Sequence, residues 1–149
     1  MKHLGSMLGI LVLLSAGVVA ADDGDRDKLI GSWVSTAGEV ASGWTFERTG
    51  DTFQIKSSVG SSAEATYACK ADGQQCAIKT AGKKSSISMW FNGPKLVQME
   101  TQGSTIVKRR FAVQATGDTM ELEIMPMSPS GKTETIQYKR APLSSAQAK

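Results

Sequence analysis

The chain has 149 residues, of which 40% are hydrophobic and 21% are charged, and its formal net charge is +3. This length is enough for one domain with a modest hydrophobic core. The small net charge excludes the strongly basic surface that binding to nucleic acids or anionic membranes requires.

Residues 1–21 have the pattern of a cleavable signal peptide. Lys2 precedes the apolar run Leu8–Val19, and Ala20-Ala21 supplies a small-residue cleavage site without a cysteine that could carry a lipid. The run is shorter than the roughly 20 residues that cross a bilayer, so cleavage is favoured over a membrane anchor. We therefore predict a secreted or periplasmic protein without stable membrane insertion. The only histidine, His3, is removed with the signal peptide.

One domain over residues 22–140 is expected to follow, and the small, polar segment 141–149 is expected to be a disordered tail. A single helical turn at Asp25–Leu29 is the helical candidate. After it, polar and apolar residues alternate, and turn residues recur at regular intervals. The expected strands are Ile30–Ser35, Gly43–Arg48, Thr52–Ser57, Glu64–Lys70, Gln75–Thr80, Ser85–Phe91, Leu96–Thr101, Thr105–Gln114, Met120–Met125 and Glu134–Arg140.

The alternation predicts an apolar inner face and a polar outer face for these strands. The inward positions include Trp44, Phe46, Phe53, Ile55, Tyr67, Cys69, Cys76, Ile78, Ile87, Met89, Phe91, Val97, Met99, Val107, Phe111, Val113, Met120, Leu122, Ile124, Ile136 and Tyr138. The polar outer face excludes an outer-membrane barrel. The sequence predicts an all-β fold, an antiparallel meander barrel of about 8–10 strands, with a β-sandwich as the alternative.

The cysteine spacing predicts a structural disulfide between Cys69 and Cys76. Asp72-Gly73, between them, is a favoured two-residue hairpin turn. Such a turn sets the two cysteines opposite each other, with Cα atoms roughly 4.5–5.5 Å apart, which a disulfide accepts. The C-x-x-C spacing of a redox or metal-binding pair is absent.

The length of one turn determines which side chains of the next strand face inward. A three-residue loop over residues 92–94 places Met89 opposite Val97 and Ile87 opposite Met99, which keeps the apolar faces together. A two-residue loop does not. We therefore expect the three-residue loop.

The segment Asp25–Trp33 resembles the opening of a lipocalin or another member of the calycin group. In that group a helical turn precedes a Gly-x-Trp motif, here Gly31-Ser32-Trp33, and the tryptophan closes one end of the barrel beneath an arginine of the last strand. The resemblance implies these structural roles for Trp33 and Arg140. Ten strands resemble the fatty-acid-binding proteins more closely, but Thr36–Ala41 is too short for the two helices that those proteins place between their first strands.

The resemblance and the inner face together predict a lumen that binds a small apolar ligand, with or without an anionic head group. Arg109 shares the inner face with Val107 and Phe111, and an inward arginine needs a partner, which a ligand carboxylate or phosphate would supply. The alternative is that Arg109 lies at the barrel rim or is turned to solvent by a bulge. The expected ligand-binding residues are Arg109, Tyr138, Trp44, Phe46, Phe53, Met89, Phe111 and Met120. The inward methionines suit an adaptable lumen and a dry core equally.

The mature chain has no histidine base, no expected free thiol and no catalytic or metal-ligand motif, so we predict no enzyme, metal or cofactor. The rival function is a secreted interaction or inhibitor module with a filled core, which would use its loops or an exposed surface of Trp90 and Leu96. An enclosed volume of roughly 300 Å³ or more favours ligand binding over this rival.

Overall fold

The protein is described by a computed structural model that covers residues 23–35, 37–80 and 82–142. The expected signal peptide, and all but the first two residues of the expected tail, lie outside the described residues. In the described part, the helix α1 has five residues, and no helix has the length and apolarity to span a bilayer. The elements are α1 (Asp23–Asp27), β1 (Gly31–Ser35), β2 (Ser42–Thr49), β3 (Thr52–Val59), β4 (Ser62–Lys70), β5 (Asp72–Thr80), β6 (Lys83–Asn92), β7 (Lys95–Gln102), β8 (Thr105–Val113), β9 (Thr119–Ser128) and β10 (Glu134–Arg140).

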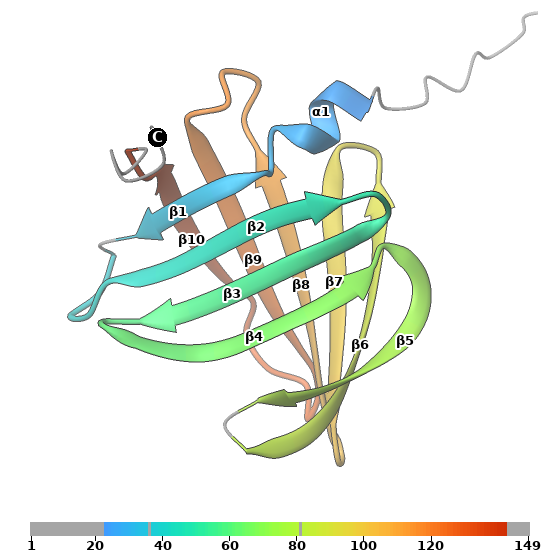
Figure 1. The fold of residues 1–149 in the computed structure, drawn as a ribbon. Coiled ribbons are helices and arrows are strands. Elements are labelled where there is room, and N and C mark those ends of the chain that lie inside the picture. The colour runs from blue at the N-terminus through green and yellow to red at the C-terminus, as the bar shows by residue number, and fades with distance from the viewer. Residues whose placement is uncertain (1–22, 36, 81, 143–149) are drawn as a thin grey trace, which may run out of the picture.

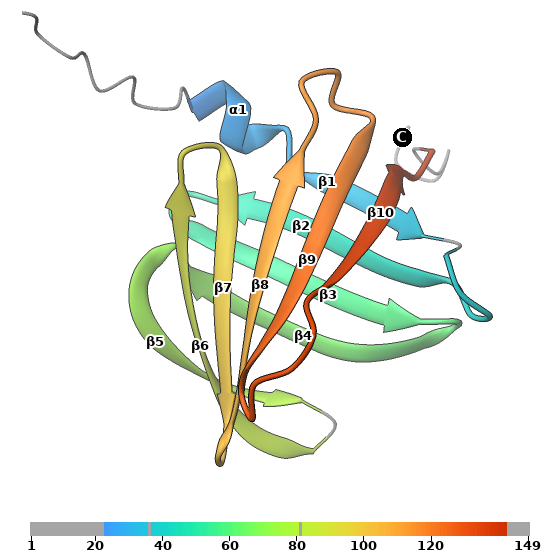
Figure 2. The same cartoon turned by 180° about the vertical axis from the view of Figure 1, so that it is seen from behind.

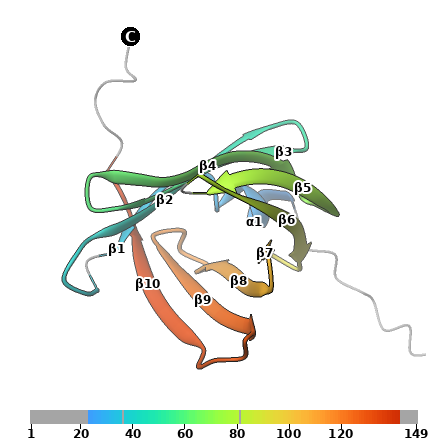
Figure 3. The ribbon, with the colours of Figure 1, turned by 90° about the horizontal axis from the view of Figure 1, so that it is seen from below.

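The ten strands form one antiparallel meander that curls into a barrel. Their order in the sheet is β4-β3-β2-β1-β10-β9-β8-β7-β6-β5, so β1 pairs with β10 and the ring of hydrogen bonds is interrupted between β4 and β5. Figures 1 and 2 show the two faces of the curled sheet, and Figure 3 shows β1–β4 on one side and β8–β10 on the other. The predicted all-β, calycin-like meander barrel is confirmed, and each of the ten expected strands is present.

An antiparallel meander puts alternate connections at opposite ends of the barrel. We call the end that carries α1 and the β2–β3, β4–β5, β6–β7 and β8–β9 connections the helix end. The far end carries the β1–β2, β3–β4, β5–β6, β7–β8 and β9–β10 connections (Figure 1).

The helix end is closed around Trp33, whose side chain is 0% exposed. Its indole Nε1 donates a hydrogen bond to the carbonyl oxygen of Leu29 (2.9 Å). The guanidinium carbon of Arg140 lies 4.2 Å from the centroid of the Trp33 ring, which is a cation–π contact. The same guanidinium donates to the carbonyl oxygens of Lys28 (2.6 Å), Ile30 (2.8 Å) and Gly117 (2.9 Å). The contact that the resemblance implies between Trp33 and Arg140 is present.

Gly31 is required at the start of β1 for two physical reasons. Its φ is +124°, a value that side chains disfavour, and a Cβ there would lie 2.6 Å from Nη1 of Arg140. The glycine of the Gly-x-Trp motif therefore makes room for the arginine that covers the tryptophan.

The β6–β7 turn differs from the sequence-based expectation. Asn92 pairs with Lys95, so the turn has two residues, and Gly93 has the positive φ (61°) that suits the first central position of a tight hairpin turn. The pairing is shifted by one residue, and the opposite face of β7 points inward. The expected inward positions of β7 were therefore wrong. The residues that face inward on β7 are Leu96, Gln98 and Glu100, which pair with Phe91, Met89 and Ile87.

This shift also removes the expected Trp90–Leu96 surface. Leu96 is 0% exposed and belongs to the core. Trp90 is only partly exposed and stands opposite Val97 rather than beside Leu96. The prediction of an exposed apolar surface formed by these two residues was wrong.

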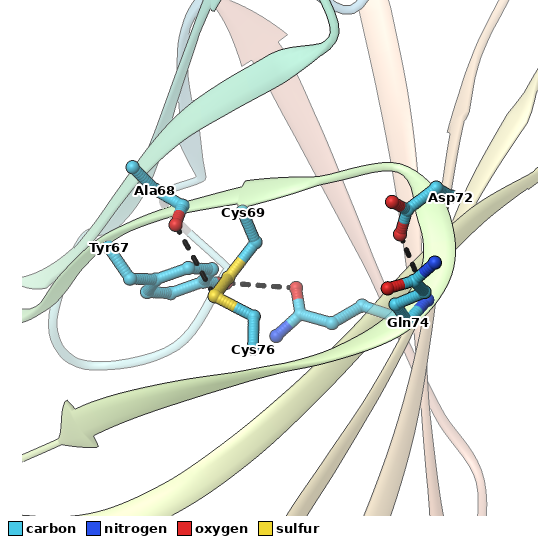
Figure 4. Close-up of a disulfide and its surroundings, with 7 residues drawn as sticks. Tyr67, Ala68, Cys69, Asp72, Gln74 and Cys76 are labelled. Atoms are coloured by element: carbon cyan, nitrogen blue, oxygen red, sulfur yellow. Dashed lines mark hydrogen bonds between the residues drawn. A yellow bond between two sulfur atoms is a disulfide. The ribbon is translucent and has the colours of Figure 1, made fainter.

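The disulfide between Cys69 and Cys76 is present, with Cα atoms 5.9 Å apart, but the expected hairpin is not. Asp72 pairs with Trp90 and Gln75 with Ser88, so the intervening residues form a bulge of β5 against β6. The Oδ1 of Asp72 accepts a hydrogen bond from the backbone N–H of Gln74 (2.9 Å) within this bulge (Figure 4). The disulfide consequently bridges β4 and β5, the two strands that no backbone ladder joins (Figure 4).

Candidate functional site

A cavity of about 370 Å³ lies at the far end of the barrel. It is lined by inward side chains of β2, β3, β4, β5, β7 and β8, on both sides of the interrupted seam between β4 and β5. Its lining residues are Trp44, Ser57, Ala63, Glu64, Ala65, Tyr67, Ile78, Thr80, Gln98, Glu100 and Arg109. Four of these residues are apolar and seven carry polar groups, so the cavity offers both apolar contact and hydrogen-bonding groups to a ligand.

An ion pair forms the polar side of this cavity. Arg109 Nη1 donates to Glu100 Oε2 at 2.7 Å, and the two side chains are 20% and 15% exposed. The second oxygen of Glu100 accepts from the hydroxyls of Ser85 (3.2 Å) and Thr80 (3.5 Å). Arg109 does face the interior, and its partner is this internal carboxylate.

A second polar pair stands beside the ion pair. The Tyr67 hydroxyl donates to Gln98 Oε1 at 2.9 Å, and both side chains are buried. Burial raises the pKa of Tyr67 well above its usual value, because ionisation would place a charge away from water. The positive charge of Arg109 opposes this rise in the pKa only in part.

The structure divides the eight expected ligand-binding residues into two groups. Trp44 and Arg109 line the cavity. The other six are buried in the packed core: Phe46, Phe53, Met89, Phe111, Met120 and Tyr138. The hydroxyl of Tyr138 lies 2.9 Å from Ser42 Oγ, so it is not a partner of Arg109.

The sequence reasoning missed most of the cavity lining. Tyr67 and Ile78 are among the predicted inward positions but not among the expected ligand-binding residues. Gln98 and Glu100 face inward although alternation predicts Val97 and Met99 on the inner face of this strand, and a glycine-first two-residue turn at Gly93-Pro94 is the signal that could have found them. The small residues of β3 and β4 carry no sequence signal for a cavity.

A smaller hollow of about 310 Å³ lies at the helix end. Its charged lining residues include Arg26, Arg48, Asp51, Lys70 and Asp72. Arg48 donates to Asp27 (2.9 Å), and the Arg26 guanidinium stands 4.9 Å from the centroid of the Phe91 ring. This hollow is therefore built largely from surface charges, whereas the far-end cavity is built from the inner faces of the strands.

Comparisons with known proteins give a fold but no family. No protein-family model matches the sequence, and no curated protein matches it. Among solved structures, the chain is similar to a Schistosoma mansoni fatty acid binding protein in complex with arachidonic acid, with a TM-score of 0.67 and 18% identity over 80% of this chain and 100% of that one. It is also similar to secretory abundant heat soluble protein 4 from Ramazzottius varieornatus (TM-score 0.64, 15% identity, 78% and 96% covered).

A third similar structure is fatty-acid-binding protein 1 of Echinococcus granulosus (TM-score 0.65, 7% identity, 78% and 99% covered). At these identities the similarity shows a shared fold, the antiparallel meander barrel described above. The segment between β1 and β2 is predicted to be too short for the two helices of the fatty-acid-binding proteins. In the structure β2 begins at Ser42, and no helix lies between the two strands among the described residues.

Proposed function

We propose that this protein is an exported binding protein that takes a small apolar ligand into the far-end cavity. The single observation that carries the proposal is the cavity of about 370 Å³ inside a barrel that is otherwise packed. Its volume lies in the range of small-molecule sites. Trp44 and Ile78 supply apolar wall, and Arg109 belongs to the polar side. The fatty-acid-binding proteins among the similar structures support the same class of ligand.

Export is the second part of the proposal. The Cys69–Cys76 disulfide is typical of proteins in oxidising compartments. Together with the sequence pattern of residues 1–21, it supports a secreted or periplasmic location. We expect the intact mass of protein recovered from that compartment to correspond to a chain that starts near Asp22; a mass that retains residues 1–21 would contradict cleavage.

Binding, rather than catalysis, is the proposed activity. The cavity holds an ion pair, five further polar side chains and four apolar residues, without a histidine or thiol among its lining residues. The rival function, an interaction module with a filled core, is less well supported because the far end contains a cavity and because Leu96 is buried.

A fluorescent ligand tests the proposal. Nile red is uncharged and apolar and brightens in an apolar site, so we expect saturable binding to the wild-type protein. Ala65 lines the cavity, and A65W would fill much of it with an indole ring. We expect A65W to weaken Nile red binding by at least roughly tenfold, because the ring occupies the space of the ligand.

The matched control is T66W, which adds the same ring to the neighbouring, exposed position on the outer face of β4. We expect T66W to bind Nile red like the wild type, with circular dichroism showing that both variants are folded. Absence of saturable binding to the wild type, or equal binding by A65W and the wild type, would refute the proposal.

A further inference from the structure

We infer that the far-end cavity prefers an apolar chain with an uncharged head group, such as a carboxamide, ester or alcohol, over a fatty-acid anion. This inference rests on the proposed function, since it concerns the ligand of the same cavity. It is carried by the charges and hydrogen bonds of the lining side chains.

The one arginine that lines the cavity already has an anionic partner. Glu100 stands 2.7 Å from Arg109 Nη1, and its other oxygen is held by Ser85 and Thr80. Three donors from three strands, β5, β6 and β8, therefore fix this carboxylate in place. A ligand carboxylate would have to share the guanidinium with Glu100 or displace it from all three donors.

The charge balance of the lining also opposes an anion. Arg109 is the one basic residue among the lining residues, whereas Glu100 and Glu64 both supply carboxylates. A fatty-acid anion would be a second carboxylate at the Arg109 guanidinium, beside Glu100, and the exposed Glu64 adds a further negative charge to the lining. In a partly buried site like charges repel more strongly than in water. An uncharged head group avoids this repulsion.

The remaining hydrogen-bonding capacity suits an uncharged head group. Gln98 is 1% exposed and lines the cavity, and its Oε1 accepts from Tyr67. Within the described residues no acceptor is found for its Nε2, so this group is free to donate to a ligand oxygen. A carboxamide oxygen can accept from Gln98 while its N–H group donates to a lining carboxylate; a fatty-acid anion offers acceptors alone.

A pair of ligands of nearly equal shape tests this inference. Displacement of Nile red by dodecanamide and by dodecanoate at neutral pH compares an uncharged and an anionic head group on the same chain. We expect dodecanamide to bind the wild type roughly tenfold more tightly. Tighter binding of dodecanoate would overturn the inference while leaving the proposed function intact. Displacement by neither compound, together with no binding of Nile red, would overturn both.

The variant E100Q tests the cause of the preference. Replacing the carboxylate by an amide leaves Arg109 without its anionic partner, so we expect dodecanoate affinity to rise on the order of tenfold and dodecanamide affinity to change little. The matched control is E123Q, which neutralises the partner of Arg110 on the outer face of the same barrel wall. It makes the same change in net charge, and we expect it to leave the ligand preference unchanged. A folded E100Q that gains no affinity for dodecanoate, or an equal gain in E123Q, would contradict the inference.

Discussion

The two ends of the barrel each hold a partly buried arginine, and the difference between their partners indicates what each end does. At the helix end, Arg140 lies over Trp33 and donates to three backbone carbonyl oxygens. At the far end, Arg109 is bound to the carboxylate of Glu100 and borders a cavity. Backbone acceptors are fixed by the fold, whereas a side-chain carboxylate can respond to a ligand. The arginine of the helix end thus stabilises the fold, whereas that of the far end borders the site where we propose that a ligand binds.

The tryptophan near each end is also packed differently: the one at the helix end is fully buried, and the one at the far end borders the cavity. Trp33 is fully enclosed by the core beneath Arg140. Trp44 packs edge-on against Phe111, with ring centroids 5.0 Å apart, but its other surroundings include the cavity. The comparison predicts that tryptophans of equal size contribute unequally to stability.

Replacing each tryptophan by alanine tests this prediction and has the largest expected effect. We expect W33A to lower the free energy of unfolding by about 4 kcal/mol, because it leaves a large void and removes the contacts to Leu29 and Arg140. W44A should cost about 2 kcal/mol, because one side of the ring faces a hollow that already exists. Urea unfolding measures both values. Equal losses would show that the two ends are packed alike.

How well the sequence predicts the molecule also differs between the two ends. The closure of the helix end depends on two short sequence features, the Gly31-Ser32-Trp33 motif at the start of the domain and Arg140 at its end. Both features can be recognised from the sequence alone. The far end depends on the register of β7, which one residue in the β6–β7 turn decides. Alternation favours the register that turns Val97 and Met99 inward, whereas in the structure Gln98 and Glu100 face inward.

The polar interior could not be predicted from one strand at a time. Gln98 and Glu100 are tolerated inside because Gln98 Oε1 accepts from Tyr67 of β4 and Glu100 accepts from Arg109 of β8. Such compensation depends on side chains of other strands, and Tyr67 stands 31 residues from Gln98 in the sequence. The same limit applies to the disulfide: its cysteines were identified correctly, but the bulge that positions Cys76 depends on pairing with β6.

Removing the Cys69–Cys76 disulfide tests how strongly it holds β4 and β5 together along the seam between them. Because β4 and β5 share no backbone ladder, we expect C69S/C76S to lower the free energy of unfolding by about 2 kcal/mol, the value for closing so short a loop. Hydrogen exchange should become faster in β4 and β5 than in β1 and β10. Uniformly faster exchange across all ten strands would instead mean that the seam has no local role.

The smallest of these effects concerns Tyr67, the buried phenol beside the cavity. At neutral pH we expect Y67F to lower the free energy of unfolding by about 1 kcal/mol, because Gln98 Oε1 loses its donor.

Burial raises the pKa of Tyr67 in the folded state above the value of about 10 in the unfolded chain, so the folded state holds the phenolic proton more tightly. This contribution to stability is complete below pH of about 10 and is lost as the pH rises further, when the unfolded chain ionises first. Y67F should therefore show a shallower loss of unfolding free energy above that pH than the wild type, whereas Y138F, which retains Tyr67, should keep the contribution of Tyr67 to the alkaline loss. Urea unfolding at a series of alkaline pH values measures the slopes, and a Y67F slope equal to that of the wild type would show that Tyr67 ionises as readily in the folded barrel as in the unfolded chain.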